Sequence, residues 1–224
     1  MNSIRNNFDR PGVANYHANP LEKVFAWFFS IVFHPVFIPV YVTFFLLYVH
    51  PNAFAGFSYE DKRQTLLIIV LNLVFFPLLS VLLLKALGFV NSIKLNTRKD
   101  RVIPYIASGI FFFWAYTVFK EQSHYPLLLT SFILGIFLAS SAALLANIYL
   151  KVSMHAIGVG GLVAFMLVVL IEGIQMPWLI AAAVLVTGIV CTSRFLISDH
   201  SGKEMILGLV IGIVTQIAAA WIIL

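Results

Sequence analysis

The chain has 224 residues, of which 61% are hydrophobic and only 10% are charged, and its mean hydropathy is +0.99. A typical soluble domain is about 45–50% apolar and about 25% charged, so a soluble single domain, a disordered chain and a disulfide scaffold are excluded. The net charge of +5 does not indicate a nucleic-acid binder, because the basic residues form no long solvated stripe. A polytopic membrane protein is what remains.

Apolar segments of membrane-crossing length follow one another along the chain. A helix needs about 20 mostly apolar residues to cross a bilayer, and seven segments come close to this length. They predict an all-α, polytopic transmembrane helix bundle with six to seven spans, formed by a single domain over residues 22–224. Residues 1–21 are polar and lack a secretory signal, so we expect a loop or a surface helix there. The predicted segments are 22–48, 66–90, 102–119, 125–150, 152–171, 177–197 and 205–224.

Prolines interrupt the first segment. His34 and Pro35 are adjacent, and Pro39 follows four residues later. Proline removes a backbone donor and clashes with the preceding turn, so we expect a kinked or re-entrant helix. A histidine within lipid is costly unless it faces protein or water, and we expect a structural role for His34. In the fifth segment, Gly158, Gly160 and Gly161 predict close helix packing, since small residues let helix backbones approach.

Charged and polar residues gather in three clusters at segment ends. The clusters cover residues 94–101, 151–155 and 193–204. Two predicted segments separate the first cluster from the second, and two more separate the second from the third. Because an even number of crossings returns the chain to the same face, we expect all three clusters on one side of the membrane.

The three clusters together hold the residue types that bind and cleave a phosphate. Cations neutralise the phosphoryl oxygens, and arginine does so with a planar fork. One histidine can attack phosphorus while another protonates the leaving oxygen. A carboxylate can orient the first histidine, and a helix N-terminus can bind an anion. The candidate residues are Lys94, Arg101, Ser153, His155, Arg194, His200 and Glu204.

At these positions the chain resembles the type-2 phosphatidic acid phosphatase superfamily of membrane lipid phosphatases, whose fold is shared with vanadium haloperoxidases. The family pattern begins with Lys, six residues and Arg-Pro, continues with Pro-Ser-Gly-His, and ends with Ser-Arg, five residues, His, three residues and Asp. The chain follows it with Lys94 and Arg101, then with Val-Ser-Met-His at 152–155. Its third part is Ser193-Arg194, His200 and Glu204. The likeness covers the part of the chain from residue 94 onward, and the motifs themselves end at residue 204.

The resemblance implies a role for each matched residue. His200 would be the nucleophile that forms a phospho-histidine, His155 the general acid for the leaving group, and Glu204 the group that orients His200. The phosphoryl oxygens would be held by Lys94, Arg101, Ser153 and Arg194. Neither a metal nor another cofactor is implied, because the cations already supply the charge stabilisation.

Four positions depart from the family pattern. The proline after Arg101 is displaced to Pro104, Val152 replaces the second proline, Met154 replaces the glycine, and Glu204 replaces the aspartate. A side chain at Met154 is expected to narrow the pocket. Glu204 keeps the carboxylate on a longer stem.

The function expected from this resemblance is hydrolysis of a lipid phosphate or diphosphate, with the membrane and the lipid as partners and no nucleic acid. The resemblance implies an integral protein of a bacterial inner membrane with an extracytoplasmic site. The excess of basic residues on the cluster side favours the cytoplasm instead, although Lys94, Arg101, Lys151 and Arg194 have a catalytic explanation.

Two other functions are consistent with parts of the sequence. A prenyltransferase would hold magnesium diphosphate, but such a site needs several carboxylates, and the cluster side offers only Asp100, Asp199 and Glu204. A transporter or flippase for an anionic lipid, or an inactive relative of the phosphatases, would use the kinked first segment and the cations. The two histidines would then have no explanation.

Overall fold

The structure is a computed structural model that describes residues 19–89, 98–174, 176–197 and 201–224. The described residues form helices, six of which are long and apolar enough to cross a membrane. The prediction of an all-α, polytopic transmembrane bundle is therefore confirmed. In chain order the elements are α1 Pro20–Val32, α2 Ile38–Tyr48, α3 Tyr59–Ile69, a π-helical turn Val70–Phe75, α4 Phe76–Ala86, α5 Arg98–Glu121, α6 Leu127–Tyr149, α7 Met154–Ile171, α8 Trp178–Ile197 and α9 Gly202–Ile223.

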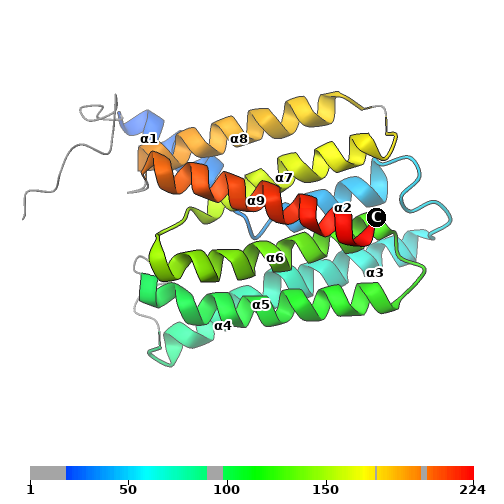
Figure 1. Cartoon of the computed structure of the whole chain (residues 1–224), viewed down its shortest axis with the longest axis horizontal. Coiled ribbons are helices and arrows are strands. Elements are labelled where there is room, and N and C mark those ends of the chain that lie inside the picture. The colour runs from blue at the N-terminus through cyan, green and yellow to red at the C-terminus, as the bar shows by residue number, and fades with distance from the viewer. Residues whose placement is uncertain (1–18, 90–97, 175, 198–200) are drawn as a thin grey trace, which may run out of the picture.

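The first predicted segment is a helix broken in two. Helix α1 ends at Val32, and α2 begins at Ile38 after the Pro35 break. Figure 1 shows α1 at the end of the bundle where α8 finishes, whereas α2 reaches the opposite end, where α3 starts. The segment therefore runs the length of the bundle. Of the two predicted alternatives, a kinked helix and a re-entrant one, the structure shows the kinked helix.

The second crossing is one continuous helical rod, Tyr59–Ala86. It starts seven residues before the predicted segment 66–90, because the Ser58 side chain caps the Asp61 N–H and the Asp61 carboxylate accepts from the Ser58 N–H. Such a capping box satisfies two free donors and lets a helix begin among polar residues. Within the rod, the π-helical turn ends two residues before Pro77, whose ring cannot fit against the carbonyl four residues earlier.

Helix α7 lies at the centre of the bundle and packs most extensively against α9. The two backbones approach where a glycine of one helix lies against the backbone at the other: a Cβ on Gly160 would lie 2.5 Å from the Leu209 carbonyl oxygen, and one on Gly208 would lie 2.8 Å from the Ser153 carbonyl oxygen. Packing at Gly160 was predicted, and the structure shows its partner. Gly158 makes a similar approach to the Pro35 break, with a built Cβ 2.9 Å from the Pro35 side chain.

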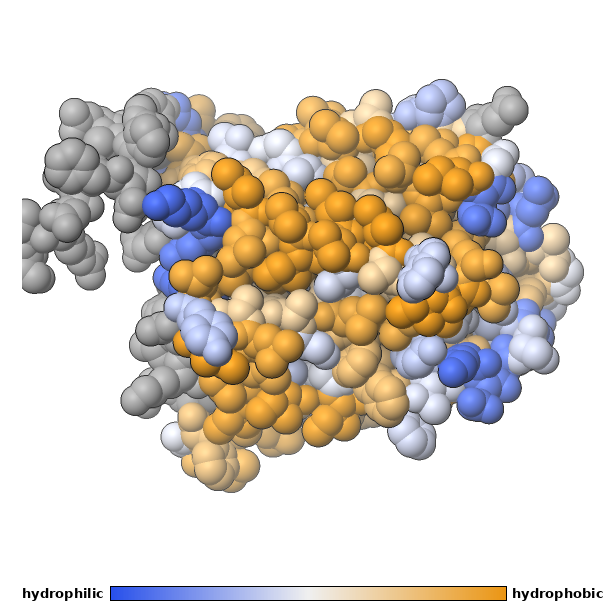
Figure 2. Space-filling model, viewed as in Figure 1, coloured by the Kyte–Doolittle hydropathy of each residue, from blue (hydrophilic) through white to orange (hydrophobic). Residues whose placement is uncertain are grey.

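The outer surface of the bundle is an apolar belt with polar ends. Figure 2 shows hydrophobic side chains along the middle of the molecule and hydrophilic ones at both ends. Large exposed side chains such as Ile110, Leu185 and Val214 belong to this belt. So much exposed apolar surface would be unfavourable in water. The surface therefore agrees with helices that are long and apolar enough to cross a membrane.

One end of the bundle collects the termini that carry the polar clusters. The end of α4, the start of α5, the end of α6, the start of α7, the end of α8 and the start of α9 all lie there (Figure 1). The parts of the three clusters that the structure describes therefore share one side of the bundle, as the crossing count predicts.

The α7–α9 contact generates a stability prediction. Gly160→Ala should destabilise the protein by about 1–3 kcal/mol, the usual cost of overpacking, although alanine is the better helix former. Gly188→Ala is the matched control, since a Cβ at Gly188 in α8 meets nothing within 4 Å; it should be neutral or stabilising. Thermal unfolding in detergent measures both, and equal melting temperatures would contradict the close approach.

The shared end generates a topology prediction. In a Cys191→Ser background, single cysteines at Leu87 and Lys203 should be modified from one side of the membrane by an impermeant thiol reagent. Cysteines at Glu121 and Glu172 should be modified from the other side, because these exposed positions lie at the opposite end. Labelling of Leu87 and Lys203 from different sides would contradict the arrangement.

Candidate functional site

A cavity of about 720 Å³ opens between the helices and contains the described cluster residues Arg101, Lys151, His155 and Arg194 on its wall. Its volume lies within the range of about 300–1,000 Å³ that ligand sites occupy. The cavity continues into the bundle as far as Gly135 of α6 and Gln216 of α9. Three motifs that are distant in sequence therefore contribute to one hollow.

Arg101 is positioned in the first turns of α5 and is only 8% exposed. Its Nη1 donates to the Val152 carbonyl at 3.0 Å, which ties α5 to the segment just before α7. A guanidinium has five donors in a planar fork. Arg101 can thus hold this segment while still presenting charge to the cavity.

Helix α7 begins beside Arg101 and carries His155 in its first turn. Ser153 is the N-cap, and its hydroxyl accepts from the Ala156 N–H at 3.4 Å. The Ser153 N–H in turn donates to the Glu204 carbonyl at 3.4 Å, which joins α7 to α9. Ser153 is fully buried, so its polar atoms serve the helix start.

The break after α1 meets His155 and Arg194. The His155 Nε2 lies 3.1 Å from the Ser30 carbonyl oxygen, and the Arg194 Nη1 donates to the Ser30 hydroxyl at 3.4 Å. The His34 ring contacts the His155 ring edge-to-face, with centroids 4.9 Å apart. Ser30 and His34 both line the cavity.

The structure brings together some of the predicted site residues and not others. Arg101, His155 and Arg194 share the cavity wall. Ser153 is buried as a helix cap, and Glu204 is at the third position of α9; neither lines the cavity. Lys94 and His200 lie outside the described residues, so their predicted roles stay predictions.

Pro104 and Met154, two of the residues that depart from the lipid phosphatase pattern, also lie at the cavity. Pro104, about one turn after Arg101 in α5, is on its wall, and so is Met154. The Met154 sulfur accepts from the Tyr105 hydroxyl at 2.7 Å. The methionine side chain therefore occupies space at the cavity edge, where the family pattern has a glycine.

Ser30, His34 and Lys151 are cavity residues that the sequence did not assign to the site. His34 carried a signal, since an intramembrane histidine beside a proline needs a protein partner or water. For Lys151 the sequence left two interpretations, a contact with the substrate and an anchor at the membrane interface. Ser30 carried no signal, because nothing in the sequence indicates which helix α1 will contact.

The cavity wall combines cations with proline breaks. Its described residues include Arg101, Lys151 and Arg194 with two histidines, but no aspartate or glutamate. Charges of one sign in a cleft with low-dielectric walls focus the field on a ligand of the opposite sign. The described wall also holds four prolines, which come from the break after α1, from α2, from the second crossing and from α5. They are Pro35, Pro39, Pro77 and Pro104.

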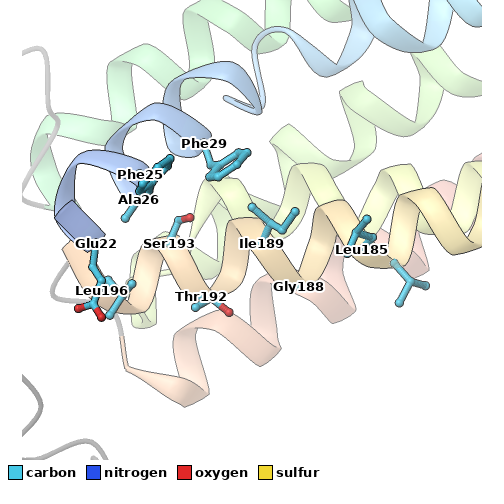
Figure 3. A pocket seen from close by; sticks show the side chains of 11 residues that line it. Glu22, Phe25, Ala26, Phe29, Leu185, Gly188, Ile189, Thr192, Ser193 and Leu196 are labelled. Carbon is cyan, nitrogen blue, oxygen red and sulfur yellow. The ribbon is translucent and has the colours of Figure 1, made fainter. Parts of the chain in front are cut away.

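A second hollow lies outside the cavity, between α1 and α8. Figure 3 shows Phe25 and Phe29 of α1 facing Ile189 of α8, with Glu22 and Ser193 at the same groove. The groove is shallow and mostly apolar. Ser193 thus faces away from the cavity that its neighbour Arg194 lines, although both belong to one motif.

Comparison of the chain with family models, with curated proteins and with solved structures finds no match.

The buried position of Arg101 generates a prediction. Arg101→Ala should lower the stability by about 1.5–3 kcal/mol, the usual worth of a hydrogen bond to a charged group. Arg63→Ala is the matched control, because Arg63 pairs with Glu60 on the exposed surface, where ion pairs stabilise little. Thermal unfolding in detergent measures both variants. Equal effects would show that the bond to Val152 does not anchor the segment before α7.

Proposed function

We propose that the protein is a membrane phosphatase that cleaves a lipid phosphate or diphosphate through a phospho-histidine. The observation that carries this proposal is the convergence of Arg101, His155 and Arg194 on one cavity. These residues come from three separate helices, and they match three separate motifs of the lipid phosphatase pattern.

The charge of the cavity supports a phosphoryl ligand. Arg101 and Arg194 can bind non-bridging oxygens, with Lys151 adding a third positive charge at the same wall. Donors that are already held in place stabilise the charge that develops on the transferring phosphoryl group without reorganising. Arg101 is held by Val152 and Arg194 by Ser30.

The surroundings of the cavity support a lipid. The wall that carries the cations also has apolar side chains, among them Leu73, Val81 and Phe112. The exposed belt of the bundle would face the acyl region of a bilayer. A ligand with an anionic head and a hydrocarbon tail matches both parts, whereas a small soluble phosphate ester would leave the apolar part unfilled.

The reaction follows from the proposed roles. A ring nitrogen of His200 attacks phosphorus, the bond from phosphorus to the lipid oxygen breaks, and His155 gives its proton to that oxygen. A water then attacks the phospho-histidine and passes a proton to His155. The nitrogen–phosphorus bond breaks, and inorganic phosphate and the original histidines are restored. Glu204 would orient His200 through a hydrogen bond.

A transporter or an inactive lipid-binding relative is the second candidate. The break between α1 and α2 at the cavity wall favours it, since broken helices around a polar cavity are typical of transporter sites. The same cations would hold an anionic head group without cleaving it. The two candidates differ in whether His200 and His155 are needed.

Phosphate release from lipid phosphates, measured with EDTA present, tests the proposal. Wild type should release phosphate, His200→Ala should release none, and EDTA should cause no loss. His155→Ala should lower kcat/KM for alkyl phosphates by about 10²–10⁴-fold, as general acids contribute. The same variant should lower kcat/KM for an activated aryl phosphate much less, because that leaving group needs no proton.

His124→Ala is the control for these histidine variants, since His124 lies between α5 and α6, with aromatic contacts to Phe57 and Tyr125. It should keep wild-type activity. If folded wild-type protein released no phosphate from any lipid but bound anionic lipids, the transporter or inactive relative would be favoured. Activity lost only through EDTA would indicate a magnesium-dependent enzyme.

A further inference from the structure

The break between α1 and α2 places the backbone of α1 in direct contact with the candidate catalytic residues. Ser30 is only 3% exposed and contacts both α7 and α8 through two different atoms. Its carbonyl oxygen meets the His155 ring, and its hydroxyl meets Arg194. This part of the chain lies more than 60 residues before the first matched motif.

The proline break explains why the Ser30 carbonyl is available. In an uninterrupted helix this carbonyl would accept from the N–H of residue 34. The His34 N–H donates instead to the Ile31 carbonyl at 3.1 Å, and the Phe33 N–H to the Phe29 carbonyl at 2.9 Å. Pro35 has no N–H for the Ile31 carbonyl, and this carbonyl takes the His34 N–H instead. The break therefore leaves the Ser30 carbonyl for a partner outside the helix.

The contact with Ser30 fixes the protonation pattern of His155. A carbonyl oxygen only accepts, so His155 donates from Nε2, and its Nδ1 is then the nitrogen that gains or loses a proton. A hydrogen bond that orients one ring nitrogen sets the tautomer and the direction of the other. The ring of His34 packs on His155 from the side, and its Nδ1 accepts from the Val36 N–H at 3.3 Å.

Packing keeps the break against α7. The Tyr41 hydroxyl donates to the Val32 carbonyl at 2.7 Å, which satisfies the end of α1. Gly158 leaves room for Pro35 on the face of α7, one turn after His155. The contact between the break and His155 is thus supported by Tyr41 of α2 and by Gly158 of α7.

We propose that Ser30 and His34 are positioning residues: the Pro35 break presents the Ser30 carbonyl to His155 Nε2 and the Ser30 hydroxyl to Arg194, while His34 holds the imidazole ring. The catalytic consequence rests on the proposed phosphatase function. The contacts themselves can be tested without it. The charged or titratable described residues at this cavity are His34, Arg101, Tyr105, Lys151, His155 and Arg194.

Pro35→Ala is the sharpest variant, because it lets the helix continue so that the Ser30 carbonyl accepts from residue 34. Its readout is the ratio of kcat/KM for an aryl phosphate to that for an alkyl phosphate. Loss of a hydrogen bond to a charged group should raise this ratio about tenfold or more, in the same direction as His155→Ala. Pro126→Ala, at the start of α6, is the matched control and should leave the ratio unchanged.

Side-chain variants separate the two residues. Ser30→Ala removes the Arg194 contact and should raise KM and lower kcat for both phosphates alike; Ser141→Ala, whose hydroxyl bonds only within α6, should do neither. His34→Ala should raise the aryl-to-alkyl ratio, and His34→Phe should preserve it by keeping the ring. In a His155→Ala background, Pro35→Ala and His34→Ala should change the ratio no further.

Nuclear magnetic resonance of ¹⁵N-histidine-labelled protein in detergent provides a readout independent of activity. His155, assigned by its absence in His155→Ala, should be protonated at Nε2 when neutral, and Pro35→Ala should shift its titration. A neutral His155 protonated at Nδ1, or a titration unchanged by Pro35→Ala, would overturn the inference. If these signals behave as expected but no lipid phosphate is cleaved, the contacts stand and the phosphatase function fails.

Discussion

A backbone carbonyl that a proline releases inside a membrane protein must find a donor within the protein, because lipid offers none. The Ser30 carbonyl has such a donor in His155. Pro77 and Pro104, which lie within continuous helices, are on the wall of the same cavity. The π-helical turn before Pro77 is a further irregularity of the backbone in the second crossing.

The second constraint is charge. Placing Arg101, Lys151 and Arg194 around one cavity in an apolar bundle is costly unless solvent, other polar groups or a ligand compensate them. Arg101 donates to the Val152 carbonyl and Arg194 to the Ser30 hydroxyl, so both guanidinium groups are held against the protein. A guanidinium presents its donors in fixed directions. An anionic head group at this wall would compensate the three charges, which is the reason for proposing phosphate chemistry there.

The sequence predicted the features that depend on composition and order along the chain. Apolar length located the spans, and the even number of crossings placed the three clusters at one end. Five of the long segments agree with the observed helices to within four residues at each end, whereas α3 starts earlier because the Ser58–Asp61 capping box lies outside the apolar pattern. The roles of Ser30 and His34 were not predictable, since they depend on how α1 docks on α7 and α8. Ser153 matched its motif, yet the structure uses its hydroxyl to cap α7.

The most direct test of the central claim is to trap the covalent intermediate. Purified protein in detergent is mixed with an activated aryl phosphate, quenched in alkali, where phospho-histidine survives, and analysed by mass spectrometry. The account predicts phosphate on His200 in wild type, more of it in His155→Ala, where water attack lacks its base, and none in His200→Ala. Turnover without a phosphorylated histidine, or phosphate on a residue remote from the cavity, would contradict it.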